Sequence, residues 1–293
     1  KERGNQSMYP KNKEKELSRE LFANPTNEYR GAPFWAWNQK LDPDTLRRHI
    51  DYFREMGIGG FHMHCRTGLD TPYMGEEYKR CVKLCVEKAR QEGMFAYLYD
   101  EDRWPSGSAG GLVTKDARYR SRYLVFTCIP NEKRKQGGEG VPSTAAAGVQ
   151  GNGRLLARYE IRLEGGFLAE YRRLSENEAP GNGGKIWYLY EEIARDSPWY
   201  NNQTYVDTLN REAICRFIEE THEQYLDCVG EDFGGVVPSI FTDEPQFSHK
   251  TSLGFAESEE DVILPWTDGL PEGYGKYYGA VFFDTVQELI WDL

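Results

Sequence analysis

The chain has 293 residues, a net charge of −11 and 14% aromatic residues. Its length accommodates one large domain or two ordinary ones. The acidic balance argues against a nucleic-acid partner, because proteins that bind nucleic acids normally present a basic face. No run reaches the roughly 18–20 apolar residues that a membrane span needs, so we expect no membrane span. The composition leaves the compartment open between the cytoplasm and secretion.

The six cysteines show no CxxC spacing and no repeating pattern. A domain of this size needs no disulfide scaffold. Cys81, Cys85, Cys215 and Cys228 fall at core-like spacing in helical patterns, which predicts that they are buried thiols.

The first part of the chain alternates between strand and helix patterns after a charged leader at 1–24. The predicted elements are strands at 33–38, 59–64 and 95–100, and helices from Asp42 to Gly57 and from Glu76 to about Gln91. This order predicts parallel strands joined by right-handed crossovers.

The pattern changes after the third strand. Strand-like alternation follows at Tyr123–Ile129, Leu155–Leu163, Phe167–Leu174 and Lys185–Glu192. Glycine-rich breaks separate these runs, and the stretch at 137–153 is expected to be mobile. A helix capped by Asn210 is then predicted, with Ile214, Phe217, Ile218, Thr221 and Tyr225 on its buried face. A fourth parallel strand at Val236–Phe241 and a last helix from about Phe282 to Leu293 complete the prediction.

These elements predict an α/β fold: the first four strands of a (β/α)8 TIM-type barrel with a β-rich insertion after strand three. The predicted parts are the leader at 1–24, barrel strands one to three at 25–120, the insertion at 121–205 and the barrel continuation with strand four at 206–293. Strands five to eight are missing by this count, so we expect the first half of a longer protein. An open sheet that looks like half a barrel is the alternative.

Asp243 and Glu244 end the apolar fourth strand, directly before Pro245. Barrel enzymes place their chemistry at the carboxyl ends of their strands. Glycoside cleavage needs one carboxylic acid at the leaving oxygen and a second carboxylate as nucleophile or base. Alternation along the strand places Glu244 on one face with Thr242 and turns Asp243 to the other. Glu244 is therefore the predicted acid, and a solvated loop carboxylate is the plain alternative.

A second cluster follows strand three, where Asp100, Glu101 and Asp102 precede Arg103 and Trp104. Three acidic residues at the end of a buried strand need a cation, hydrogen bonds or raised pKa values. The small residues after Trp104 suit tight turns and exposed amides that bind sugar hydroxyls. A well-capped loop that introduces the insertion is the alternative reading.

His62 and His64 lie two residues apart on the second strand and point the same way, whereas Phe61 and Met63 face the helix layer. A pair of this kind can mark a metal-dependent hydrolase, but that reading needs further ligands. We favour His64 and Arg66 as hydrogen-bond donors to a sugar.

Three further residues are candidates for substrate binding: Trp37, Asn38 and Tyr205. Trp37 and Asn38 end the first strand, and Tyr205 lies in an aromatic, amide-rich segment before the third helix. Trp35 and Trp37 share a face, and core packing is the better explanation for at least one of them.

Taken together, the segments PFWAWN, GIGGFHMHCRTGLDTPY, YLYDEDRWPSGSAGG and SIFTDEP resemble glycoside hydrolase family 106, the α-L-rhamnosidases. The likeness covers about residues 30–290. It implies a TIM-type barrel, inverting hydrolysis of terminal α-L-rhamnosides or similar sugars, and calcium dependence without identifiable ligands. It marks Glu244 and Glu101 as the carboxylates to test, with His64, Arg66, Asp100 and Trp104 near the sugar. Cys65 and Thr67 depart from the expected small or proline residues.

The prediction is therefore a glycosidase with a carbohydrate substrate, in which Glu244 protonates the leaving oxygen. Glu101, or a carboxylate beyond residue 293, activates water. Two alternatives remain: a metal-dependent barrel hydrolase that uses His62 and His64, and a non-catalytic carbohydrate-binding relative.

Overall fold

The computed structural model describes residues 15–16, 18–134, 149–181 and 183–292, which form two compact units. The first unit contains the residues up to Val113 and Cys215–Pro245, and the second contains Thr114–Ile214 and Gln246–Leu293. Most of the predicted leader and most of the glycine-rich stretch at 137–153 lie outside the described residues.

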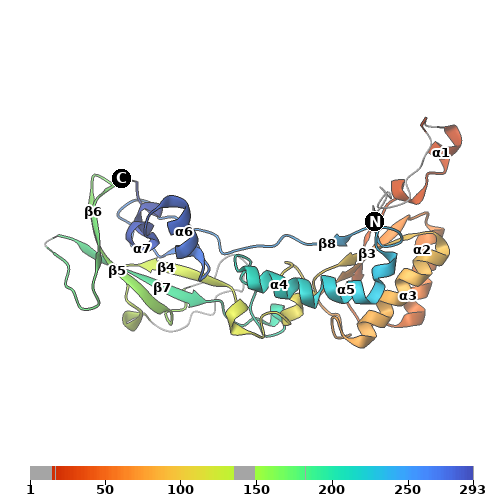
Figure 1. The fold of residues 1–293 in the computed structure, drawn as a ribbon, viewed down its shortest axis with the longest axis horizontal. Helices are drawn as coiled ribbons and strands as arrows, with labels where there is room; N and C mark the ends of the chain where they lie inside the picture. Colours follow the sequence, from red (N-terminus) through yellow and green to blue (C-terminus); the bar gives the residue numbers. More distant parts are fainter. Residues whose placement is uncertain (1–14, 17, 135–148, 182, 293) are drawn as a thin grey trace. The chain divides into compact units, whose positions relative to one another are not determined.

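The first unit is built on a parallel sheet with the strand order β1-β2-β3-β8. Figure 1 labels β3 and β8 of this sheet. Its strands are β1 (Phe34–Trp37), β2 (Gly60–Cys65), β3 (Phe95–Tyr99) and β8 (Ile240–Phe241). Its helices are α1 (Arg19–Ala23), α2 (Pro43–Glu55), α3 (Glu76–Glu92) and α5 (His222–Val229), with 3-10 turns at Asn27–Tyr29, Ala109–Gly111 and Gly230–Asp232. The predicted parallel α/β arrangement of this part is confirmed.

Local signals set the ends of α2 and α3 as the sequence predicts. The Asp42 side chain accepts a hydrogen bond from the amide of Thr45 at 2.8 Å and so caps α2. Gly93 ends α3 in the left-handed conformation, with φ of 68°, which costs glycine little because it has no Cβ.

The two faces of the parallel sheet differ in what covers them. Trp35, Trp37, Phe61, Met63 and Leu98 belong to the core cluster that also contains the buried faces of α2, α3 and α5. Phe34, His62, His64, Tyr99 and Phe241 make ring contacts with one another on the opposite face. Trp35 and Trp37 therefore both pack beneath the helices, whereas the two histidines point away from them, as predicted for His62 and His64.

The fourth strand is shorter than predicted. The segment from Val236 runs beside β3, because the amides of Ala96 and Leu98 donate to the carbonyls of Val236 and Ser239. Only Ile240 and Phe241 have ladder geometry. Pro238 offers no N–H to a ladder, which accounts for the gap.

The second unit is built on an antiparallel sheet with the strand order β6-β5-β7-β4-β9. Its strands are β4 (Arg122–Thr127), β5 (Arg154–Glu164), β6 (Phe167–Leu174), β7 (Lys185–Ile193) and β9 (Val262–Trp266). Its helices are α6 (Leu270–Tyr278) and α7 (Phe282–Thr285), with 3-10 turns at Ala117–Tyr119, Asn131–Lys133, Pro198–Tyr200 and Val286–Leu289. The sequence grouped residues 246–293 with the barrel, but here they join the β-rich unit, where β9 pairs with β4.

Three expectations about the later elements are wrong. The single predicted helix is divided into α4 (Arg211–Glu220) and α5 at Thr221, and Ile218 is exposed. The last helix is only α7 followed by a 3-10 turn. All six cysteines are free, but of the four predicted to be buried Cys215 is exposed and Cys228 is only partly buried.

In the part of the chain that the structure describes, we find no helix with the length and apolar character required to cross a membrane.

Candidate active site

The carboxyl ends of β2, β3 and β8 bring the predicted polar residues of the first unit together. His64 is near the end of β2, Asp100 and Glu101 directly follow β3, and Asp243 and Glu244 follow β8. Since β3 lies between β2 and β8, these three ends are neighbours in the sheet.

Glu101 is the anchor of the loop that follows β3. Its carboxylate is 1% exposed and accepts five backbone N–H hydrogen bonds of 2.5–3.0 Å. The donors are the amides of Asp102, Gly107, Ser108, Ala109 and Gly110. The small residues of this loop thus turn their amides toward one buried carboxylate.

The contacts of Glu101 favour a structural role. Burial raises the pKa of its carboxyl to about 8, and the amide donors oppose that shift. Five donors exceed the approximately four lone-pair positions of a carboxylate, so the amides of the loop occupy both oxygens of Glu101. A general base also needs a free lone pair toward water. The catalytic role of Glu101 stays a prediction.

Asp100 is fully buried between β3 and β8. Its two oxygens accept hydrogen bonds of 2.6 Å from the hydroxyls of Ser106 and Thr242. Burial raises the pKa of Asp100, and these two hydroxyls oppose the shift. Ser106 also accepts from the amide of Asp243 at 2.8 Å, and its own amide donates to the carbonyl of Asp243 at 2.8 Å. Ser106 therefore joins the loop after β3 to the segment after β8.

Asp243 points to the sheet face that carries the histidines. Its Oδ2 atom accepts a hydrogen bond of 3.1 Å from the hydroxyl of Tyr99 and lies 3.9 Å from His64 Nε2. Burial raises the pKa of Asp243, whereas the Tyr99 hydroxyl lowers it. The ring of His64 packs on that of Tyr99, with 4.0 Å between ring centroids.

Glu244 is exposed and has a φ of 45°, in the left-handed region that non-glycine residues rarely adopt. Its Oε2 atom accepts a hydrogen bond of 3.0 Å from the indole N–H of Trp104. Simple alternation would place Glu244 on the face of Thr242, but the positive φ interrupts that pattern. The structure thus brings Glu244 and Trp104 together, and backbone strain of this kind is common at functional sites.

His64 makes the stability of the fold depend on pH. Burial, followed by the charge of Arg66, lowers the pKa of His64 from 6.5 to about 4. As the pH falls from about 6.5 toward 4, the unfolded chain binds a proton that the folded chain does not. The free energy of unfolding should therefore decrease by roughly 2–3 kcal/mol over this window through His64 alone.

Urea denaturation between pH 7 and pH 4 measures this contribution. The wild-type chain should lose more stability over the window than His64→Gln, by the amount given above. His249→Gln, which removes an exposed histidine, serves as the matched control and should follow the wild type. Equal slopes for wild type and His64→Gln would contradict the prediction.

The other predicted binding residues are not all brought to this cluster. Trp37 is 1% exposed and packs against Tyr78, so a ligand on the open face of the sheet does not reach it. Asn38 and Arg66 are exposed at the ends of β1 and β2. Tyr205 lies in the second unit, where its hydroxyl accepts a hydrogen bond from the amide of Gln246.

His62 and His64 form no metal-ligand cluster with other side chains in the part of the chain that the structure describes. Among the described residues, no group of three or more His, Cys, Asp or Glu side chains is placed to hold a metal ion. His62 instead stacks on Tyr97, with 4.4 Å between ring centroids, and its Nδ1 lies 3.1 Å from the carbonyl of Ala32. The metal-dependent hydrolase therefore stays an alternative prediction.

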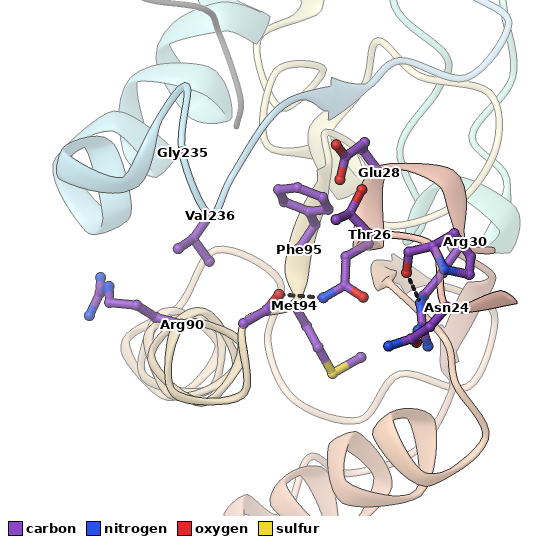
Figure 2. Close-up of a pocket in the computed structure, with 12 residues that line it drawn as sticks. Asn24, Thr26, Glu28, Arg30, Arg90, Met94, Phe95, Gly235 and Val236 are labelled. Atoms are coloured by element: carbon purple, nitrogen blue, oxygen red, sulfur yellow. Dashed lines mark hydrogen bonds between the residues drawn. The ribbon is translucent and has the colours of Figure 1, made fainter. Parts of the chain in front are cut away.

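A cavity of about 650 Å³ lies at the opposite, amino-terminal end of β3 (Figure 2). Its lining includes Arg30, Phe95 and Val236. The guanidinium of Arg30 donates to the carbonyls of Pro25 and Gly57, so its polar groups already serve the fold. This cavity is separate from the cluster at the carboxyl ends of the strands.

The likeness of this chain to known proteins is weak. The chain matches no family model and no curated protein. Among solved structures, a rhamnosidase from Novosphingobium sp. PP1Y is similar at 13% sequence identity, with a TM-score of 0.46. The match covers 90% of this chain and 41% of that enzyme, so the chain spans less than half of its length. At this identity and TM-score we base no argument on the likeness.

Sequence reasoning missed two residues that shape the cluster. Ser106 was treated only as a small loop residue, yet it connects Asp100 to Asp243. His222 was not among the candidate residues, yet its Nε2 lies 3.7 Å from Asp100 Oδ2. No local pattern in the sequence identifies either residue. Ser106 contacts Asp100 across a turn and Asp243 in a distant segment, and His222 is far from Asp100 in the sequence.

Proposed function

We propose that this chain is part of a glycoside hydrolase that acts on a terminal deoxyhexose such as α-L-rhamnose by carboxylate general acid/base catalysis. The observation that carries the proposal is Glu244, an exposed carboxylate in a left-handed backbone conformation beside Trp104. It lies at the carboxyl end of a parallel sheet, where α/β enzymes bind their substrates. The sequence likeness to family 106 supports the same substrate class.

In this mechanism Glu244 donates its proton to the leaving oxygen of the glycoside. One of its oxygens accepts the N–H of Trp104, which orients the carboxyl group of this exposed side chain. We assign Asp243 as the second carboxylate rather than Glu101, since the lone pairs of Glu101 are occupied. The exposed ring of Phe34, 55% exposed beside His64, offers an apolar surface to the C–H bonds of a sugar.

The proposal includes a TIM-type barrel to which β1, β2, β3 and β8 contribute neighbouring strands, with the buried faces of α2, α3 and α5 packed on one face. It also includes calcium dependence, which rests on the sequence likeness alone. No described residue is assigned as a calcium ligand.

Aryl glycosides test the proposal directly. The purified chain should release the aryl group from an α-L-rhamnoside faster than from an α-L-fucoside or a β-D-glucoside, and EDTA should reduce that rate if calcium is required. NMR of the first-formed anomer then gives the stereochemistry, with inversion expected. Saturable binding of L-rhamnose without any hydrolysis would overturn the catalytic proposal and favour the carbohydrate-binding alternative.

A further inference from the structure

The break between α4 and α5 places a histidine beside the buried Asp100. Thr221 leaves the helical conformation, with φ of −123° and ψ of −74°, and α5 begins at the next residue, His222. The imidazole of His222 is one third exposed, and its Nε2 lies 3.7 Å from Asp100 Oδ2. This distance is too long for a hydrogen bond, but it allows an ion pair when the imidazole is protonated.

The contacts of Thr221 fix which nitrogen of His222 carries the proton. At the helix break, the Thr221 hydroxyl donates a hydrogen bond of 2.6 Å to the carbonyl of Phe217. Thr221 Oγ1 also lies 2.9 Å from His222 Nδ1. Because the hydroxyl proton is already used, Nδ1 must be the donor in this second bond. The neutral imidazole therefore keeps its proton on Nδ1 and turns the lone pair of Nε2 toward Asp100.

The Asp100 carboxylate accepts hydrogen bonds from two hydroxyl groups. The hydroxyls of Ser106 and Thr242 donate these hydrogen bonds, and the backbone amide of Asp243 in turn donates a hydrogen bond to the hydroxyl oxygen of Ser106. The other titratable side chains whose pKa values Asp100 raises are the phenols of Tyr73, Tyr99 and Tyr225. These phenols stay neutral, so His222 is the neighbour in this set that can supply a positive charge.

We propose that His222 is a positioning residue, which orients Asp100 and, through Ser106, the backbone of Asp243 next to Glu244. Since Nδ1 is committed to Thr221, a second proton binds His222 only at Nε2 and converts the contact with Asp100 into an ion pair. The kinetic consequence rests on the proposed role of Glu244, whereas the geometric consequence does not.

NMR tests the geometry without any assay of activity. In protein labelled with ¹⁵N-histidine, the neutral side chain of His222, assigned by its loss in His222→Gln, should carry its proton on Nδ1. Thr221→Val removes the acceptor, so the proton should move to Nε2, where it can donate to Asp100. A proton on Nε2 in the neutral wild-type side chain would overturn the inference.

The coupling to Asp243 is tested in the same protein. His222→Phe should shift the backbone amide signal of Asp243, and His222→Gln, whose amide N–H can donate toward Asp100, should return it toward the wild-type position. An Asp243 signal that is indifferent to both changes would show that His222 does not position this segment.

Kinetics then separates positioning from fold maintenance. His222→Phe should lower kcat about tenfold with KM nearly unchanged, and His222→Gln should recover most of the loss. A chain that shows the expected NMR behaviour but no glycosidase activity would overturn the proposed function and leave the positioning geometry supported. An active chain whose kcat is unchanged in His222→Phe would overturn the positioning role alone.

Discussion

Replacing Glu244 with glutamine should lower glycoside hydrolysis about 10³-fold, the range expected when a general acid is removed. Glutamine keeps an oxygen that can accept the Trp104 N–H, but its amide has no acidic proton that it can transfer to the leaving oxygen. Steady-state rates on an activated aryl glycoside and on an alkyl glycoside measure the effect. The alkyl glycoside should suffer more, because its poorer leaving group depends more on protonation.

The matched control is Glu87→Gln, which removes the same charge from an exposed position of α3. It should retain wild-type rates. Glu244→Gln should change the free energy of unfolding by no more than about 0.5 kcal/mol, since the side chain is exposed. A Glu244→Gln enzyme with rates near the wild type would remove Glu244 from the mechanism.

The strained backbone of Glu244 gives this test a second arm. Glycine adopts a φ of 45° without the cost that a Cβ imposes, which is about 1 kcal/mol. Glu244→Gly should therefore be inactive and at least as stable as the wild type. If Glu244→Gly is more stable than the wild type but inactive, the strained backbone at this position is retained because catalysis needs the Glu244 side chain.

Replacing Glu101 with glutamine should destabilise the first unit by about 3–5 kcal/mol. The buried carboxylate accepts five amide hydrogen bonds with its two oxygens, whereas a glutamine side chain offers one acceptor oxygen. Its NH₂ group would also face backbone N–H donors, leaving several of them buried without an acceptor. Urea denaturation followed by tryptophan fluorescence measures the change in the free energy of unfolding.

Ser108→Ala is the control for this loop. The amide of Ser108 donates to Glu101, but its buried hydroxyl has no hydrogen-bond partner among the described residues. Removing the hydroxyl should therefore leave stability within about 0.5 kcal/mol of the wild type, or raise it slightly. If Glu101→Gln were as mild as Ser108→Ala, the amides of the loop would not depend on the carboxylate, and a catalytic role for Glu101 would regain support.

Local periodicity was sufficient for the early elements. The limits of α2 and α3 follow from Asp42, Gly57 and Gly93, and the limits of β2 and β3 follow from short apolar runs. The division of α4 from α5 was not predictable in this way, because the apolar spacing continues through Thr221. The hydroxyl of Thr221 donates a hydrogen bond to the carbonyl of Phe217. A side-chain hydrogen bond that competes with the helical hydrogen bonds cannot be inferred from the spacing of apolar residues.

The candidate site was partly visible in the sequence. Polar residues after apolar strands mark the carboxyl ends of β3 and β8, so Asp100, Glu101, Asp243 and Glu244 were all identified. The separate roles of these four carboxylates could not be predicted from the sequence. Trp37 also looked available to a ligand, but its face of β1 packs beneath the helices, and the sequence of one strand does not tell which face the helices cover.

The sequence by itself determined the order of strands and helices, and with it the parallel sheet and the placing of carboxylates at the ends of its strands. Only the tertiary structure decided what each carboxylate does. Glu101 is saturated by amides of its own loop, Asp100 accepts from two hydroxyls beside His222, and Glu244 alone is exposed beside an indole. The reason is physical: hydrogen bonding and burial set the charge and reach of a carboxylate, and both depend on residues that meet only when the chain is folded.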